Sequence, residues 1–97
     1  MYSLQNIKVL IIEAKLNRNV ESFSKMDPFC VLTHDKVKYK TKYIDEAGME
    51  VRWDEEFDFN IRDTGEDVKV SVYDYDKTWN DLVGETVLDI GKMLKEG

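Results

Sequence analysis

The sequence predicts an all-β fold, an antiparallel Greek-key β-sandwich built by a single domain. Apolar and polar residues alternate with a period of two in several short runs, which is the pattern of strands that bury one face. Long polar connections separate these runs, as in a sandwich whose loops gather at the ends of two sheets. The chain has 97 residues, no internal repeat and no linker-like stretch, so we expect residues 1–97 to form one domain.

Six runs are expected to form strands, with a seventh if the third run is split or extended. They cover residues 7–12, 29–33, 36–43, 57–61, 68–72 and 83–90. Pro28 stands just before the second run, and proline is tolerated at the start of a strand but not in its middle. The connections 17–27, 44–53 and 74–82 are long, and loops on a rigid scaffold are where binding residues are expected.

Composition and charge exclude several classes of protein. The net charge of −6 makes nucleic acid an improbable partner. No apolar run approaches the roughly 20 residues that span a bilayer, and the N-terminus lacks the features of a signal peptide. The lone Cys30 cannot form an internal disulfide, which favours a cytoplasmic setting. Cys30 and His34 would lie about 13 Å apart along a strand, too far for a catalytic pair, so we expect no enzyme.

The segment 73–81 carries three aspartates at a predicted strand end. Asp74 and Asp76 are two residues apart, so their side chains should lie on one side, and the turn should bring Asp81 back toward them. Crowded carboxylates repel one another unless a cation neutralises them, and Ca2+ accepts six to eight oxygen ligands in irregular geometry. The alternative is a set of solvated acids. An EF-hand is excluded, because its loop needs glycine where Trp79 stands.

A fourth aspartate stands in the first long connection. Asp27 precedes Pro28, which restrains the backbone of the residue before it to extended geometry. If the first and third connections share one end of the sandwich, Asp27 faces the cluster of Asp74 and Asp76.

Five segments together resemble the C2 domain, a calcium- and lipid-binding module found in protein kinase C and the synaptotagmins. Residues 8–16 look like the opening strand of the family. Residues 26–31 resemble its Ser-Asp-Pro-Tyr-x-Val signature, and residues 39–42 resemble its Lys-Thr-Lys strand. Residues 53–59 resemble Trp-Asn-Glu-x-Phe-x-Phe, and residues 74–76 with 80–85 resemble the third calcium-binding loop.

The resemblance implies a Ca2+ site formed by five acidic positions. Four of them map onto Asp27, Asp74, Asp76 and Asp81, whereas Glu21 stands nearest to the fifth, with Asn19 as an alternative. A Glu in place of an Asp can weaken the site, because ligand charge and rigidity set affinity. The family has eight strands, and its eighth is absent here. Either the chain is a piece of a longer protein, whose other domains are then candidate partners, or a sheet edge is open to another segment.

The resemblance also implies that the loop tips contact anionic phospholipid, as in a peripheral membrane protein of the cytoplasm. Trp79 suits the membrane interface, and Phe23 and Val20 are the candidates in the first loop, with ordinary packing as the alternative. A lysine row could bind phosphoinositide, or could be a solvated strand face. It comprises Lys36, Lys38, Lys40 and Lys42. The competing hypothesis is a protein-interaction or calcium-independent phosphoinositide-binding module with a degenerate calcium site.

Overall fold

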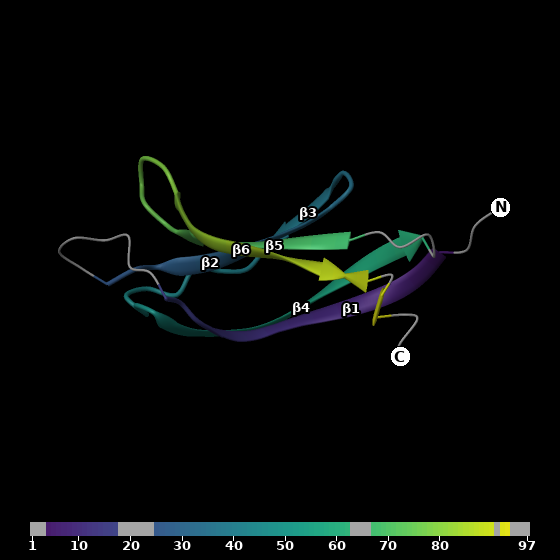
Figure 1. Ribbon diagram of the computed structural model, residues 1–97. Coiled ribbons are helices and arrows are strands. Elements are labelled where there is room, and N and C mark those ends of the chain that lie inside the picture. Colours follow the sequence, from purple (N-terminus) through teal and green to yellow (C-terminus); the bar gives the residue numbers. More distant parts are fainter. Residues whose placement is uncertain (1–3, 18–24, 63–66, 91, 94–97) are drawn as a thin grey trace.

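The computed structural model describes residues 4–17, 25–62, 67–90 and 92–93. Across them, six strands form two antiparallel sheets that face each other, which confirms the predicted β-sandwich (Figure 1). No helix among these residues has the length and apolar character needed to cross a membrane. The strands are β1 (Leu4–Lys15), β2 (Pro28–His34), β3 (Val37–Lys40), β4 (Glu50–Arg62), β5 (Asp67–Asp74) and β6 (Asp81–Asp89).

The two sheets differ in size, with β1 and β4 in one and the order β3-β2-β5-β6 in the other. The β3–β4 and β5–β6 connections lie at the end of the sandwich where β2 begins (Figure 1). We call this end, formed by residues 25–27, 41–49 and 75–80, the loop end. Strand pairing brings three chain positions together there, because Asp74 pairs with Pro28 on one side and with Asp81 on the other.

The core fills the space between the sheets and fixes the register of the strands. Leu32, Phe59, Ile61 and Val68 are fully or almost fully buried. Burying a side chain of this size contributes about 1.5–3 kcal/mol. A slip of one residue would turn such side chains to solvent, so the core determines which residues reach the loop end.

Strand β3 is shorter than the alternation over residues 36–43 predicts, since it ends at Lys40. The reason is Thr41, whose Oγ1 accepts a hydrogen bond from the Cys30 N–H at 2.9 Å. The Thr41 N–H still donates to the Cys30 carbonyl at 2.9 Å, so one of the two backbone hydrogen bonds of this residue pair is kept. Because a side-chain oxygen replaces the backbone acceptor, regular pairing stops and the chain leaves the sheet toward β4.

Candidate functional site

Three of the predicted aspartates stand at strand ends of the loop end. Asp27 immediately precedes β2, Asp74 is the last residue of β5, and Asp81 is the first residue of β6. The Asp27 N–H donates to Asp74 Oδ1 at 2.8 Å, and the Asp27 carbonyl accepts from the Tyr75 N–H at 3.0 Å. The first and third connections are therefore joined by hydrogen bonds that involve both backbone groups of Asp27 and the side chain of Asp74.

Asp74 is the most unusual side chain of the site. It is 1% exposed, and its Oδ2 is buried without a hydrogen-bond partner in the described part of the chain. Buried polar atoms in native proteins are almost always hydrogen-bonded, and a charged one without a partner calls for an explanation such as a bound ion. Carboxylate oxygen is the ligand that hard cations such as Ca2+ prefer, so this residue fits a calcium site.

Asp76 lies in a different environment, because β5 ends two residues before it. It is exposed, and its Oδ1 accepts hydrogen bonds from the Thr78 N–H at 3.0 Å and the Thr78 hydroxyl at 2.9 Å. The backbone and then the side-chain hydrogen bond from Thr78 lower the pKa of Asp76. Its carboxylate thus bonds within its own turn, and the described residues contain no group of three acidic, His or Cys side chains placed to hold a metal.

The remaining loop candidates divide into one that the structure describes and several that it does not. Trp79 is 70% exposed in the connection between β5 and β6. The first-loop candidates Glu21, Asn19, Val20 and Phe23 lie outside the described residues.

A hollow of about 410 Å³ opens between the connections of the loop end. Two tyrosines from different connections form part of its wall, since Tyr43 and Tyr75 stack with ring centroids 4.3 Å apart and planes 8° apart. Sequence reasoning did not find this pair, because the stacking partners are far apart in the chain. The lining comprises Lys25, Asp27, Tyr43, Asp45, Tyr75, Asp76 and Lys77.

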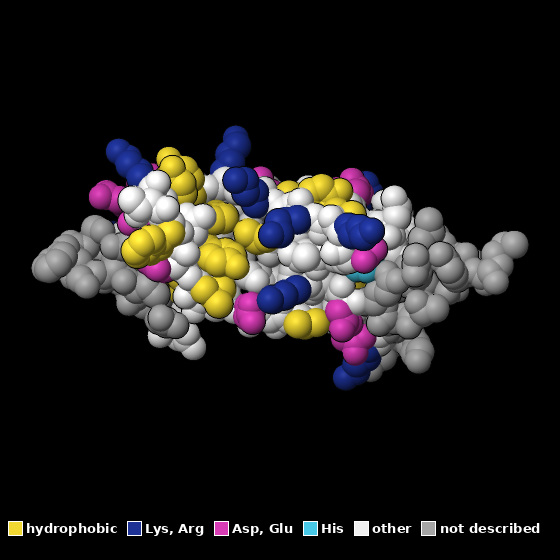
Figure 2. Space-filling view, turned by 90° about the horizontal axis from the view of Figure 1, so that it is seen from above, with side chains coloured by type: hydrophobic (Ala, Val, Ile, Leu, Met, Phe, Trp, Pro, Cys, Tyr) yellow, Lys and Arg dark blue, Asp and Glu magenta, His cyan; other side chains and the backbone are white. Residues whose placement is uncertain are grey.

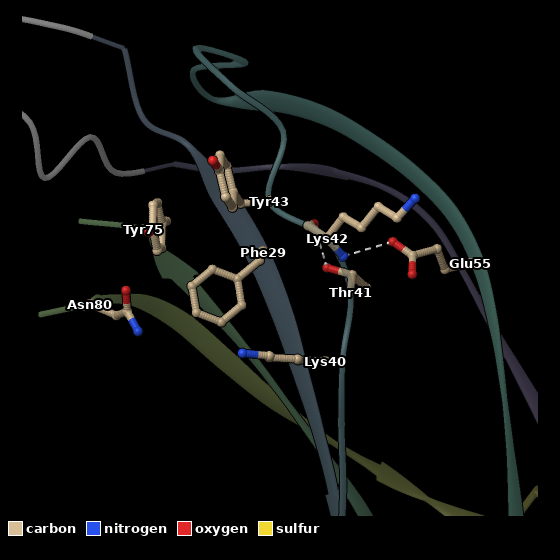
Figure 3. A pocket seen from close by; sticks show the side chains of 8 residues that line it. All are labelled: Phe29, Lys40, Thr41, Lys42, Tyr43, Glu55, Tyr75 and Asn80. Atoms are coloured by element: carbon tan, nitrogen blue, oxygen red, sulfur yellow. Dashed lines mark hydrogen bonds between the residues drawn. The ribbon is translucent and has the colours of Figure 1, made fainter. Parts of the chain in front are cut away.

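A second cavity, of about 690 Å³, lies on the outer face of the four-stranded sheet (Figure 3). Its floor is aromatic, with Phe29 stacked on Tyr73 of the neighbouring strand at 5.7 Å. Figure 2 shows this face, where hydrophobic side chains gather toward one end and Lys or Arg side chains lie beside them. The lining comprises Phe29, Lys40, Thr41, Lys42, Tyr43, Glu55, Tyr75 and Asn80.

The predicted lysine row is divided at this cavity. Lys40 extends over the aromatic floor beside Phe29, whereas Lys42 points the other way, toward Glu55 (Figure 3). Lys36 and Lys38 are exposed but do not line the cavity. Of the four predicted lysines, Lys40 and Lys42 therefore line the cavity, and Lys40 extends beside Phe29.

Comparison with known proteins assigns the family. The sequence model of the C2 domain matches residues 5–97. The chain belongs to the C2 domain family. This C2 domain is 26% identical over 92 residues to "16 kDa phloem protein 2" of Arabidopsis thaliana, covering 94% of this chain and 63% of that protein. It is 29% identical over 94 residues to "Synaptotagmin-4" of the same plant, covering 94% of this chain and 16% of that protein. The chain thus spans less than two thirds of the length of either relative.

Solved structures agree with this assignment. Human GIVD cytosolic phospholipase A2, in complex with an inhibitor and terbium chloride, superposes with a TM-score of 0.85 at 27% identity, over 95% of this C2 domain and 14% of that chain. The calcium-bound pair of C2 domains from Extended-Synaptotagmin 2 gives a TM-score of 0.85 at 18% identity, over 94% of this chain and 36% of that one. The family and the synaptotagmin relatives agree with a membrane- or lipid-binding role.

Proposed function

We propose that this C2 domain binds Ca2+ at the loop end and thereby attaches to anionic phospholipid membranes, as a peripheral protein of the cytoplasm. The observation that carries the proposal is Asp74, whose buried Oδ2 has no partner in the described residues and whose Oδ1 is fixed by Asp27. Asp27, Asp74, Asp76 and Asp81 would hold the ion, with Glu21 of the first loop as the further candidate.

Charge explains why the membrane step depends on calcium. The domain carries a net charge of −6, and its loop end is rich in carboxylates, so the bare loops repel an anionic surface. Bound Ca2+ supplies the positive charge that reverses the local potential. Trp79, exposed in the third connection, then offers an amphipathic ring to the interface between headgroups and acyl chains.

The test is co-sedimentation with phosphatidylserine-containing liposomes, with Ca2+ and with chelator. We expect binding in Ca2+ alone, lost in Asp74→Asn and in Asp76→Asn. Asp35→Asn is the matched control, because Asp35 is exposed in the β2–β3 turn, away from the loop end, and asparagine accepts its φ of 52°. Liposome binding that is equal with Ca2+ and with chelator, and equal in the wild type and the two loop variants, would contradict the proposal.

A second candidate function is calcium-independent binding of a phosphoinositide headgroup in the cavity of Figure 3. What favours it is Lys40 over an aromatic floor, in a cavity of about 690 Å³. One lysine near an anionic surface contributes about 1 kcal/mol. We expect Lys40→Gln to weaken binding to phosphoinositide liposomes in chelator, with Lys36→Gln as the control outside the cavity. Equal binding of both variants and the wild type would exclude this site.

A further inference from the structure

The two sheets of the sandwich differ in width, and this leaves one strand of the wider sheet without a strand opposite it. Strand β4 lies over β3, because Tyr39 of β3 contacts Phe57 and Phe59 of β4 with ring centroids 5.4 and 5.1 Å away. It also lies over β2, since the indole N–H of Trp53 donates to the Pro28 carbonyl at 3.2 Å. Strand β1, which pairs with β4, therefore lies over the next strand, β5. Among the described residues, no strand lies over β6.

The burial of the inner side chains agrees with this placement. Phe59 and Ile61 of β4 are buried, whereas the core-facing side chains of β1 are only half-buried. The half-buried side chains are Ile7, Val9 and Ile11. On β6, Thr86 pairs with Val70 and so shares the inner face, yet Thr86 is exposed. The free edge of β1 therefore borders an inner face that the described residues leave partly open to solvent.

Among the four edge strands, β1 is the one that charge leaves unprotected. Native sheets prevent pairing with other chains by short edge strands and by charged side chains along the edge. Strand β3 has four residues, two of them lysine, β4 carries five acidic side chains and two arginines, and β6 carries three acidic side chains. Strand β1 has 12 residues, and its central residues 9–12 are all apolar. Two of these, Leu10 and Ile12, are exposed. The edge of β1 is therefore a ready template for a further strand.

We propose that the free edge of β1 binds an extended segment of another polypeptide, which pairs with β1 as a further strand and covers the inner face of β6. The mode of recognition is the addition of a strand to a sheet edge. Apolar side chains are needed at every second position of the segment, because one of its faces closes the core beside Val9 and Leu88. Its other face needs an uncharged residue beside Leu10 and an acidic residue near Lys8, whose side chain is 65% exposed.

The shape of the sandwich excludes a second copy of this chain as the occupant. If two β1 strands paired about a two-fold axis, the inner faces of both would point to the same side. The four-stranded sheet that covers the inner face of the second β1 would then occupy the position of β6. A single extended segment has no sheet behind it, so it fits where a second copy collides. Charge favours an acidic segment over a basic one, because β1 carries two lysines and one glutamate within a domain of net charge −6.

The experiment is amide hydrogen exchange of β1, followed by NMR in chelator so that the calcium proposal plays no part. In the free domain, every second amide of residues 5–11 should exchange fast, because it points to the free edge, while the amides between them pair with β4. The probe is the synthetic peptide Thr-Val-Glu-Val-Thr-Val-Thr-Val. At a peptide concentration ten times Kd, exchange of the fast amides should slow about tenfold, because only the unbound domain exchanges. The same peptide with alternate backbone nitrogens methylated keeps its side chains and should have no effect.

Two matched variants place the peptide on the edge of β1. Leu10→Lys and Val87→Lys each replace an exposed apolar side chain of an edge strand, 51% and 56% exposed, and circular dichroism checks that each variant folds. We expect Leu10→Lys to weaken peptide binding about fivefold or more, and Val87→Lys to change it less than about twofold, because Val87 pairs with Lys69 on the outer face of the other sheet.

Four results would overturn the proposal. The first is uniformly slow exchange of β1 in the free domain, which would mean that the edge is already covered. The second is no slowing at millimolar peptide, and the third is equal slowing by the methylated peptide. The fourth is protection of β1 that rises with the concentration of the domain alone, together with a dimer in sedimentation, which would identify a second copy as the occupant.

Discussion

Replacing Asp74 by asparagine removes a buried negative charge while keeping the shape of the side chain. Asp74 is 1% exposed, and its Oδ1 accepts the Asp27 N–H at 2.8 Å, a bond that the asparagine carbonyl can also make. The other oxygen, Oδ2, has no hydrogen-bond partner in the described residues. Without a cation, the wild-type carboxylate therefore carries a desolvation cost that this one hydrogen bond only partly offsets.

The magnitude follows from two opposing terms. The effective penalty for a buried ion in a protein is several kcal/mol, and asparagine removes it. The amide nitrogen that takes the place of Oδ2 is a donor without a partner, which costs about 1–3 kcal/mol. We therefore expect the calcium-free variant to be more stable than the wild type by about 1–3 kcal/mol. For a domain of this size, each kcal/mol raises Tm by about 4–8 °C.

Calcium should reverse this order. At a Ca2+ concentration 1,000-fold above Kd, binding stabilises the wild type by about 4.1 kcal/mol, which exceeds the whole advantage of the variant in chelator. The variant lacks the buried carboxylate, so it should gain almost nothing. The assay is thermal unfolding followed by circular dichroism in chelator and in Ca2+, with Asp35→Asn as a control that should match the wild type in both. A variant that is less stable than the wild type in chelator would refute the reasoning, because the carboxylate would then be a satisfied structural group.

Three further predictions concern the surroundings of the site. Thr41→Val should lower the free energy of unfolding by about 1–3 kcal/mol, because it leaves the buried Cys30 N–H without its acceptor. An unchanged urea midpoint of unfolding would contradict the account of why β3 ends. Burial, and then the nearby Glu55, raise the pKa of the Cys30 thiol from 9.0 to about 12, so it should resist alkylation at pH 8 until the domain unfolds. Because the unfolded thiol ionises first, stability should fall as pH rises from about 9 toward 12, and a Cys30→Ala variant should lose this dependence. The pKa of Asp76 is lowered from 3.8, so the contribution of its turn is complete at neutral pH and is lost as pH falls through the lowered value. Thr78→Val removes the hydroxyl donor and should raise this pKa toward 3.8, as seen in a carboxyl NMR titration, while the remaining N–H donor keeps it from reaching that value.

The sequence was sufficient for the fold and for placing the aspartates within two residues of strand ends. Alternation of Val68, Val70 and Val72 with polar residues predicts β5, and the structure buries Val68 and Val72. Alternation is informative here because successive side chains of a strand point to opposite faces, so a strand with one buried face has apolar residues at every second position. The predicted run of residues 68–72 lies inside β5, which extends two residues further, to Asp74.

The geometry of the site could not be predicted from local pattern. Asp74 and Asp76 are two residues apart, so they would lie on one side of a continuous strand. However, β5 ends at Asp74, and hydrogen bonds from Thr78 hold the Asp76 carboxylate in its own turn. The end of β3 depends on a hydrogen bond from Cys30 to Thr41, 11 residues away in sequence. Such contacts are decided by tertiary packing, and the alternation of residues 36–43 does not contain them.

The same contrast explains how the loop end could be tuned without disturbing the fold. Asp74 and Asp81 are fixed by strand pairing, whose register is set by the core, and Asp27 is held by the hydrogen bond from its N–H to Asp74. Substitution of the buried Asp74 should therefore change stability together with binding. Asp76 is an exposed side chain, so its loss should change affinity for a cation and cost only the contribution of its own turn to stability. In the proposed calcium site, an exposed carboxylate such as Asp76 would therefore set affinity alone, whereas the buried Asp74 would set affinity and stability together.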